Sequence, residues 1–212
     1  MTVSMLIFDY DGTLVDSLQI HVNNWKQVLY EVGVDIPEAE LRKRFGMTAK
    51  DILEEVLPKH LHNKMESIAK KESKLFTAKL SELWLMPKAK EVLDEIKSKS
   101  VPMAIATSIQ KESLDESLFF LGIKDYFDHV ITGEEVSRGK PNPDILLEIT
   151  KRASVKPESC LAVGDTVYDA EAAIRAGMKV IIVGSPAFRD KLQEMKVPIV
   201  ENLQKILPYV FA

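Results

Sequence analysis

The sequence lacks several features that would assign it to particular classes of protein. It has one cysteine in 212 residues, Cys160, so an internal disulfide bond is excluded. Cys160 stands in an apolar run, where we expect a buried, unreactive thiol, and such cysteine usage fits a reducing cytoplasm. No apolar run approaches the ~20 residues of a membrane-spanning helix, and no basic leader precedes the first one. We therefore expect a cytoplasmic protein with no membrane partner.

The sequence also has no excess of positive charge. Lys and Arg number 28 against 32 Asp and Glu, and the formal net charge is −4. Nucleic-acid binding depends on clustered basic side chains, so this balance argues against a nucleic-acid partner. Internal repeats and low-complexity tracts are absent as well. Small molecules are the expected partners, and a monomer is compatible with a sequence that does not set the oligomeric state.

What the sequence does contain is a regular alternation of strand-like and helix-like segments from residue 87 onward. Residues 3–8 are almost all apolar, which predicts one strand buried on both faces. Further short apolar runs, separated by helical patterns, predict strands at 101–106, 129–132, 160–163, 180–183 and near Ile199. This alternation predicts an α/β fold, a Rossmann-like parallel sheet flanked by helices with right-handed crossovers.

A segment of about seventy residues interrupts the alternation. Between residues 17 and 86 the apolar residues recur with helical spacing and no strand-like run is found; a long helix is expected at 61–83. We therefore predict two domains, an α/β core of residues 1–16 and 87–212 and an inserted all-helical cap of residues 17–86. The cap is expected to cover the C-terminal edge of the sheet.

Two aspartates, Asp9 and Asp11, follow the first strand directly. In open α/β sheets the ligand crevice lies beyond the C-terminal ends of the strands. Two residues apart on an extended chain, these side chains point the same way and can serve one reaction centre. The alternative is that Asp11-Gly12 only forms a turn, which gives no reason for Asp9 or Thr13.

Polar residues also follow the later strands: Thr107 and Ser108 after the second, Lys140 in the loop after the third, Asp165 and Asp169 after the fourth. Each alone has an ordinary explanation, namely a helix cap for the hydroxyl residues, a solvated loop lysine, and acids in a first helical turn. If the strands are parallel, however, all of these groups converge on one edge of the sheet. Together they indicate a reaction centre.

The order and spacing of these residues resemble the four motifs of haloacid dehalogenase superfamily phosphatases: Asp9-x-Asp11-Gly-Thr, Thr107-Ser108, Lys140-Pro141 and Gly164-Asp165-x-x-x-Asp169. The resemblance covers almost the whole chain. The helical insert resembles the superfamily's first-type (C1) cap, as in phosphoglycolate phosphatases, sugar phosphatases and β-phosphoglucomutases. The resemblance to this superfamily implies Mg²⁺-dependent hydrolysis of a small phosphorylated metabolite through an aspartyl-phosphate. The metabolite would be a sugar phosphate or a phosphoglycolate-like phosphomonoester.

The resemblance also implies roles for the residues at the strand ends. Asp9 would be the nucleophile and a Mg²⁺ ligand, because a carboxylate that attacks a phosphate needs a hard cation to offset the repulsion between anions. Asp11 would be the general acid and base, and its backbone carbonyl and the side chain of Asp165 would be further metal ligands. Binding of the phosphoryl oxygens would involve Thr107, Ser108 and Lys140, and Asp169 would steady Lys140 or a metal-bound water.

Two alternative functions remain open at this point. One is a phosphosugar mutase, because His21, twelve residues after Asp9, has a spacing that resembles β-phosphoglucomutase, although a purely structural histidine is the other interpretation. Ala49 and Gly164 stand where that mutase would have an arginine and an acid, which favours the phosphatase. The more distant alternative is a signalling receiver with a lasting phospho-aspartate, a smaller domain that needs no cap.

Substrate selection is expected from a helix-breaking loop of the cap, whose residues are Arg44, Phe45, Gly46, Met47 and Thr48. Closure of the cap would place this loop over the leaving group and exclude water. Phe45 and Met47 fit ordinary cap core equally well, and Arg44 could be solvated. The sequence does not identify the phosphorylated substrate.

Overall fold

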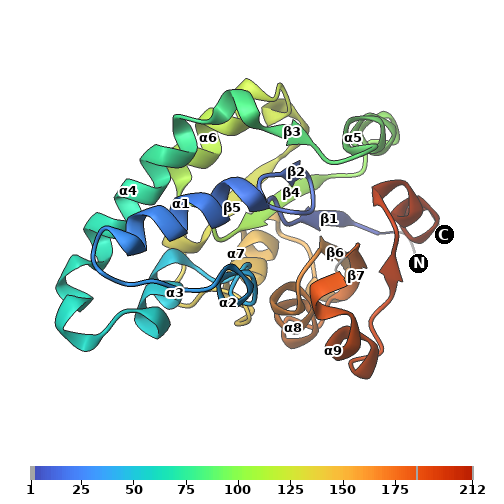
Figure 1. The fold of residues 1–212 in the computed structure, drawn as a ribbon. Helices are drawn as coiled ribbons and strands as arrows, with labels where there is room; N and C mark the ends of the chain where they lie inside the picture. Colours follow the sequence, from blue (N-terminus) through green and yellow to red (C-terminus); the bar gives the residue numbers. More distant parts are fainter. Residues whose placement is uncertain (1–2, 185, 212) are drawn as a thin grey trace.

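A six-stranded parallel sheet forms the centre of the molecule. The computed structural model describes residues 3–184 and 186–211. The strand order is β5-β4-β1-β6-β7-β8 (Figure 1). The strands are β1 (Met5–Phe8), β4 (Met103–Thr107), β5 (His129–Thr132), β6 (Cys160–Gly164), β7 (Lys179–Val183) and β8 (Ile199–Val200). The predicted α/β fold with a parallel sheet is thereby confirmed, and β1 lies between β4 and β6, so its C-terminal end is central.

Helices cover both faces of this sheet because the strand side chains alternate between two apolar clusters. Leu6 and Phe8 of β1 belong to one cluster and Met5 and Ile7 to the other. The first cluster includes side chains from α5 (Ala89–Ser98), α6 (Lys111–Phe120) and α10 (Leu207–Val210). The second includes side chains from α7 (Asp144–Ala153), α8 (Val167–Arg175) and α9 (Arg189–Glu194). Cys160 is buried in the second cluster.

The helices that follow β1 lie to one side of the sheet (Figure 1). They are α1 (Leu18–Tyr30), α2 (Glu38–Arg42), α3 (Ala49–Val56) and α4 (Met65–Thr77). The long helix expected at 61–83 is instead α4 with a 3₁₀ turn at each end, Lys59–Lys64 and Leu80–Glu82. These helices pack around an apolar cluster of their own, centred on Trp25 and Leu53. That separate cluster supports the proposed division into a core of residues 1–16 and 87–212 and a cap of residues 17–86.

One prediction about the helical insert is wrong. Trp84–Leu85 forms a short strand, β3, although no strand was expected between residues 17 and 86. It pairs antiparallel with β2 (Val15–Asp16), with Val15 opposite Leu85. A strand of two residues is too short to show an alternating pattern, so the sequence gives no sign of it. The chain therefore leaves for the helical insert and returns from it through two adjacent strands.

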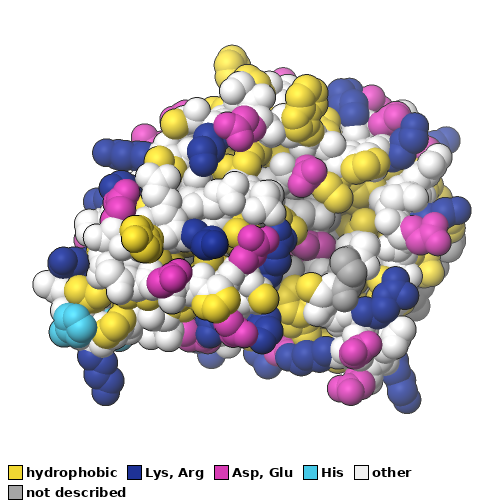
Figure 2. All heavy atoms as spheres, viewed as in Figure 1, with side chains coloured by type: hydrophobic (Ala, Val, Ile, Leu, Met, Phe, Trp, Pro, Cys, Tyr) yellow, Lys and Arg dark blue, Asp and Glu magenta, His cyan; other side chains and the backbone are white. Residues whose placement is uncertain are grey.

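The helices are short, and charges of both signs are mixed on one face of the molecule. Within residues 3–184 and 186–211, every helix is too short or too polar to cross a membrane. On the face shown in Figure 2, basic and acidic side chains are interspersed, with no area of basic charge alone.

The cluster of the helical insert makes a prediction about stability. Leu53 is 0% exposed, and truncation to alanine leaves a cavity among Trp25 and its neighbours. We expect Leu53→Ala to lower the free energy of unfolding by about 2–5 kcal/mol in urea denaturation. The control Leu147→Ala, at a side chain that is 39% exposed on α7, is expected to change it by less than about 1 kcal/mol. Equal effects of the two variants would contradict this account.

Candidate active site

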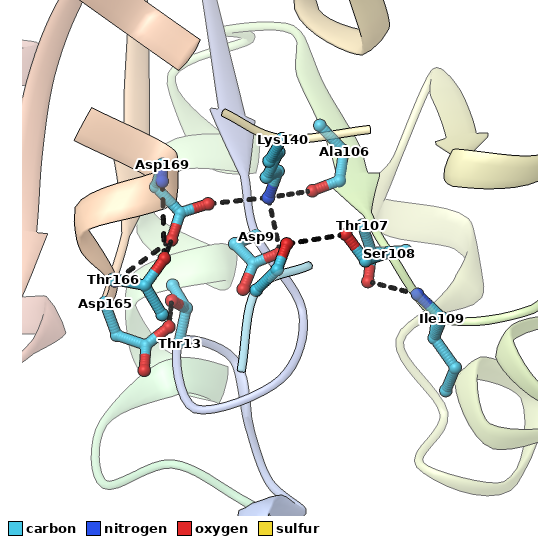
Figure 3. Close-up of polar contacts among 11 residues, drawn as sticks. Asp9, Thr13, Ala106, Thr107, Ser108, Ile109, Lys140, Asp165, Thr166 and Asp169 are labelled. Carbon is cyan, nitrogen blue, oxygen red and sulfur yellow. Dashed lines mark hydrogen bonds and ion pairs between the residues drawn. The ribbon is translucent and has the colours of Figure 1, made fainter. Parts of the chain in front are cut away.

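The predicted catalytic residues meet where the central strands end. Asp9 directly follows β1, Thr107 ends β4, and Asp165 follows β6. Because β4, β1 and β6 are parallel neighbours, these three positions share the C-terminal edge of the sheet (Figure 3). The Asp9 amide still donates to the carbonyl of Val163, at 2.8 Å, so the last hydrogen bond of the strand holds the backbone of this aspartate.

Lys140 lies buried in the middle of the site. Its Nζ donates to Asp9 Oδ1 at 2.7 Å, to Asp169 Oδ1 at 2.6 Å and to the carbonyl of Ala106 at 2.8 Å (Figure 3). These bonds use all three donors of the ammonium group. Burial alone would lower the pKa of Lys140, but Asp169 and Asp9 outweigh that effect and raise it above its ordinary range. The lysine is therefore charged and fixed in place, unlike a solvated loop lysine.

Asp169 is held by the start of α8 as well as by Lys140. The Thr166 side chain accepts from the Asp169 amide, and Asp169 Oδ2 accepts from the Thr166 amide at 3.0 Å and from its hydroxyl at 2.6 Å. Such a reciprocal cap satisfies the free amides at a helix start. A Cβ atom at Gly164 would overlap the Asp169 carboxyl group. The glycine thus leaves the space that Asp169 fills.

Asp165 is placed by the turn that follows Asp9. Thr13 Oγ1 donates to Asp165 Oδ1 at 3.2 Å. A Cβ atom on Gly12 would lie 2.5 Å from Asp165 Oδ2, and Gly12 has φ +75°, a conformation that favours glycine. The Asp11-Gly12 segment therefore forms a turn and also lies in the site, so the interpretation as a turn and the interpretation as part of a reaction centre both apply.

The buried acids outnumber the lysine that balances them. Burial raises the pKa of Asp9 to about 7, against the opposing effect of Lys140. Burial, followed by Asp169 and Asp9, also raises the pKa of Asp165. Carboxylate oxygens of Asp9, Asp165 and Asp169 all lie within 4.8 Å of one another. A group of oxygen donors with an excess of negative charge suits a hard divalent cation.

Asp11 belongs to a second polar group, which reaches into the helical insert. Asp11 Oδ1 accepts from Ser17 Oγ at 2.6 Å and lies 3.3 Å from His21 Nε2. His21 Nδ1 lies 2.8 Å from Glu72 Oε1, and the imidazole stacks on Phe76 with the ring centroids 4.5 Å apart. Burial alone would lower the pKa of His21, but Glu72 and Asp11 outweigh it and raise it to about 10. An ion-paired imidazolium thus faces the predicted acid and base.

The cap loop lies against the core. Ser108 Oγ donates to the carbonyl of Gly46 at 2.8 Å. Gly46 has φ +99°, and a Cβ atom there would lie 2.8 Å from Thr166 Oγ1. Thr48 caps α3 by accepting from the Asp51 amide, and its methyl group occupies the space beside Gly133 and Gly139. The loop therefore fits closely against the strand ends.

A cavity of about 60 Å³ lies between the helical insert and the strand ends. It is bordered by Asp9, Asp11, Thr107 and Ser108 of the core, and the predicted cap residues His21, Phe45, Gly46 and Met47 border it as well. Arg44 and Thr48 do not line this cavity: Arg44 Nε pairs with Glu55 at 3.0 Å, and Thr48 faces the core glycines. Phe45 and Met47 also pack on the apolar cluster of the insert, so both of their interpretations apply.

Sequence reasoning missed two residues of this site. Ser17 was not singled out, although it immediately precedes α1 and stands four residues before His21, one helical turn away. Glu72 lies on α4, 51 residues from its partner His21, and gave no signal because the pairing arises only when α1 packs against α4.

The parallel sheet and this group of acids around a lysine are typical of one class of enzyme, hydrolases that act on small phosphate esters. The chain belongs to the family "Haloacid dehalogenase-like hydrolase", whose model matches residues 6–183. It is 31% identical to "Phosphorylated carbohydrates phosphatase" of Thermotoga maritima over 179 residues, 82% of each chain. It is 26% identical to "Beta-phosphoglucomutase" of Bacillus subtilis, covering 84% of this chain and 82% of that one.

The fold is shared with solved structures of the same family. A putative haloacid dehalogenase-like hydrolase from Bacteroides fragilis superposes with a TM-score of 0.86 over 97% of this chain and 100% of that chain, at 24% identity. The resemblance found in the sequence is therefore confirmed, and the chain is a hydrolase of phosphoric monoesters.

The fit of Asp169 beside Gly164 leads to a prediction. In Gly164→Ala the new methyl group overlaps the Asp169 carboxyl, which must move and give up its bond to Lys140. A displacement of about 1 Å in a catalytic group costs on the order of 10²-fold in rate. We expect kcat toward para-nitrophenyl phosphate to fall by about that factor while the far-ultraviolet circular dichroism spectrum stays unchanged. A rate within about twofold of wild type would show that Asp169 tolerates the displacement.

The His21 ion pairs predict how stability depends on pH. Because folding raises the pKa of His21 from about 6.5 to about 10, its contribution is fully present below pH 6.5 and is lost as the pH rises through 10. We expect wild type to exceed His21→Gln in free energy of unfolding by a few kcal/mol at pH 6, on the order of 1.4 kcal/mol per pKa unit, and by much less at pH 10. Urea denaturation across this range measures the difference. His60→Gln, at an exposed histidine, is the control and is expected to show no such trend; a constant difference for His21→Gln would contradict the assignment.

Proposed function

We propose that the protein is a Mg²⁺-dependent phosphatase that hydrolyses a small phosphomonoester, a sugar phosphate or a phosphoglycolate-like compound, through an aspartyl-phosphate at Asp9. One observation supports this proposal most. Asp9 borders the cavity while Lys140 holds its Oδ1 from behind, and Asp165 and Asp169 complete a buried group with excess negative charge.

The donor set fits Mg²⁺. Mg²⁺ prefers oxygen ligands and is commonly bound by one or two carboxylates together with waters and phosphate oxygens. Asp9 and Asp165 would hold the ion through their side chains and Asp11 through its backbone carbonyl, while Asp169 is already engaged by Lys140 and Thr166. A bound Mg²⁺ would keep Asp9 ionised and offset the repulsion between its carboxylate and the phosphate.

In the first half of the reaction Asp9 attacks phosphorus and the ester oxygen leaves. Asp11 donates a proton to that oxygen, so that the leaving group departs as an alcohol. Lys140 balances the charge that spreads over the phosphoryl oxygens, and Thr107 donates a hydrogen bond to them. Ser108 can donate a second one once its hydroxyl leaves the carbonyl of Gly46. In the second half Asp11 takes a proton from the water that hydrolyses the aspartyl-phosphate, which divides one difficult displacement into two easier ones.

Ser17 and His21 orient the carboxylate of Asp11 for this work. Both approach Oδ1 of Asp11, Ser17 with a hydrogen bond and His21 with an ion pair. The imidazolium is in turn oriented by Glu72. A proton-transferring group held by such partners stays in line with the leaving oxygen.

The phosphosugar mutase is the second candidate, and a curated relative bears that name. A mutase must also hold a second phosphate. Ala49 borders the cavity where the mutase would offer an arginine, and the part of the cavity lining that the structure describes includes neither lysine nor arginine. Bisphosphate-dependent interconversion of sugar phosphates, without release of phosphate, would establish the mutase; stoichiometric labelling without turnover would establish the signalling receiver.

A screen of phosphomonoesters tests the proposed function. We expect phosphate release with Mg²⁺, its loss on chelation, and a fall in kcat of about 10⁴-fold in Asp9→Asn, which keeps the size of the side chain but cannot act as a nucleophile. Asp35→Asn, at an exposed acid of the helical insert, is the matched control and is expected to match wild type. Asp9→Asn as active as wild type, or release that is indifferent to Mg²⁺, would refute the proposal.

A further inference from the structure

The cavity has a polar wall to which the proposed reaction gives no role apart from the contact of Glu72 with His21. Besides Asp9, Asp11, Thr107 and Ser108, the polar residues that border the cavity include Glu72 and Ser73 of α4, Gln110 at the start of α6 and Ser113 of α6. The remaining lining is mostly apolar, with Trp25 and Phe76 as its largest side chains. The leaving group of a phosphomonoester bound at Asp9 would meet this wall, because the wall closes the same cavity.

Glu72 and His21 leave one acceptor and one donor unused in this wall. Glu72 is 7% exposed, and its Oε1 lies 2.8 Å from His21 Nδ1. Oε2 accepts no hydrogen bond from any residue that the structure describes. His21 Nε2 is buried without a hydrogen-bond partner, since its approach to Asp11 at 3.3 Å is an ion pair without hydrogen-bond alignment. A buried polar atom without a partner is unfavourable, so a ligand hydroxyl that accepts from His21 Nε2 is favoured, and Glu72 Oε2 can accept from a second hydroxyl.

Hydroxyl groups form the rest of the wall. Ser73 Oγ and Ser113 Oγ lie 2.5 Å apart, and Thr77, which does not line the cavity, supports them with its Oγ1 3.3 Å from Ser113 Oγ. Either atom of each pair can be the donor, so this group can reorient to give or accept a hydrogen bond. A hydroxyl on a ligand has the same double capacity, which matches a wall that offers both kinds of partner.

Acids outnumber basic side chains around this wall. Glu72 and Asp11 lie 2.8 and 3.3 Å from the two nitrogens of the one His21 ring, so a second anion would meet two carboxylates at low dielectric constant. The arginines near the cap loop are paired elsewhere: Arg44 binds Glu55 and the carbonyl of Glu40, and Arg42 binds Glu38. The cavity of about 60 Å³ must also hold the phosphoryl group, because Asp9 and Thr107 border it, so only a short leaving group fits beside the phosphate.

We infer that the leaving group is a short, uncharged polyol with no carboxylate or second phosphate, and that Glu72 is the side chain that excludes a second anion. The inference rests on the proposed function and narrows it to one class of substrate. Glu72 acts as a specificity-determining residue, because its Oε2 accepts a hydrogen bond from a substrate hydroxyl and repels an anion at the same place.

Three probes of similar size separate charge from hydroxyl content. We expect wild type with Mg²⁺ to hydrolyse glycerol 3-phosphate with a kcat/KM at least about tenfold above that of 3-phosphoglycerate. The reason is that 3-phosphoglycerate carries a carboxylate, which would face the carboxylate of Glu72. Glycerol 3-phosphate is also expected to exceed propyl phosphate, which lacks the hydroxyls, by about tenfold. Faster hydrolysis of 3-phosphoglycerate, or equal hydrolysis of propyl phosphate, overturns the inference.

A variant assigns the effect to Glu72. Glu72→Gln keeps the shape and can still bond to His21, but it removes the negative charge. We expect the preference for glycerol 3-phosphate over 3-phosphoglycerate to shrink by about tenfold. This preference is a ratio of two kcat/KM values measured on one preparation, so a fraction of unfolded protein does not change it. Glu66→Gln on the same helix, where Glu66 is exposed and pairs with Lys70, is the matched control and is expected to keep the wild-type ratio. An unchanged ratio in Glu72→Gln removes Glu72 from the inference.

Failure of this inference is distinct from failure of the proposed function. Mg²⁺-dependent phosphate release that disappears in Asp9→Asn supports the phosphatase whatever the order of the three probes. If the enzyme shows Mg²⁺-dependent release but hydrolyses the three probes in the opposite order, only the inference of a polyol leaving group is refuted. No release from any phosphomonoester, para-nitrophenyl phosphate included, refutes both.

Discussion

The structure depends on one buried ammonium group and on the carboxylates that it cannot fully balance. Lys140 donates three hydrogen bonds, to Asp9, to Asp169 and to the carbonyl of Ala106. With Asp165 also ionised, three carboxylates oppose one lysine. Burial of uncompensated charge is strongly unfavourable, and the raised pKa values of Asp9 and Asp165 express that cost. The site is thus built to accept positive charge, which is the property that metal-assisted attack on a phosphate ester requires.

The backbone around this group is shaped to bring the acids close together. Gly164 and Gly12 leave the space that the carboxyl groups of Asp169 and Asp165 occupy. The hydroxyl of Thr13 holds Asp165, and Thr166 holds Asp169 as it caps α8. Each of these residues lies within a few positions of a strand end, so the parallel sheet sets the distances and the turns set the directions of the side chains.

The sequence predicted the strand ends well and the contacts between helices poorly, for a physical reason. A buried parallel strand followed by acids is a local pattern, and the topology of such sheets brings these patterns to one edge, so Asp9, Lys140 and Asp165 could be grouped in advance. The β2–β3 pair is too short to show a period, and the helix expected at 61–83 breaks into turns at its ends. Glu72 and the fit of Thr48 against Gly139 depend on how the helical insert packs, which no local pattern records.

Catalysis and selection are consequently placed on different parts of the chain. The buried lysine and its acids belong to the sheet and are fixed by charge-assisted hydrogen bonds, which are among the stronger contacts in proteins. The cap loop meets the core through weaker contacts, a hydrogen bond between the neutral groups of Ser108 and Gly46 and a methyl group beside two glycines. Substitutions in the cap loop can therefore change what the cavity binds without disturbing the acids around Lys140. Glu72 borders the cavity and also contacts the His21 that faces Asp11, so in the proposed reaction the selection of the leaving group is coupled to the proton transfer that releases it.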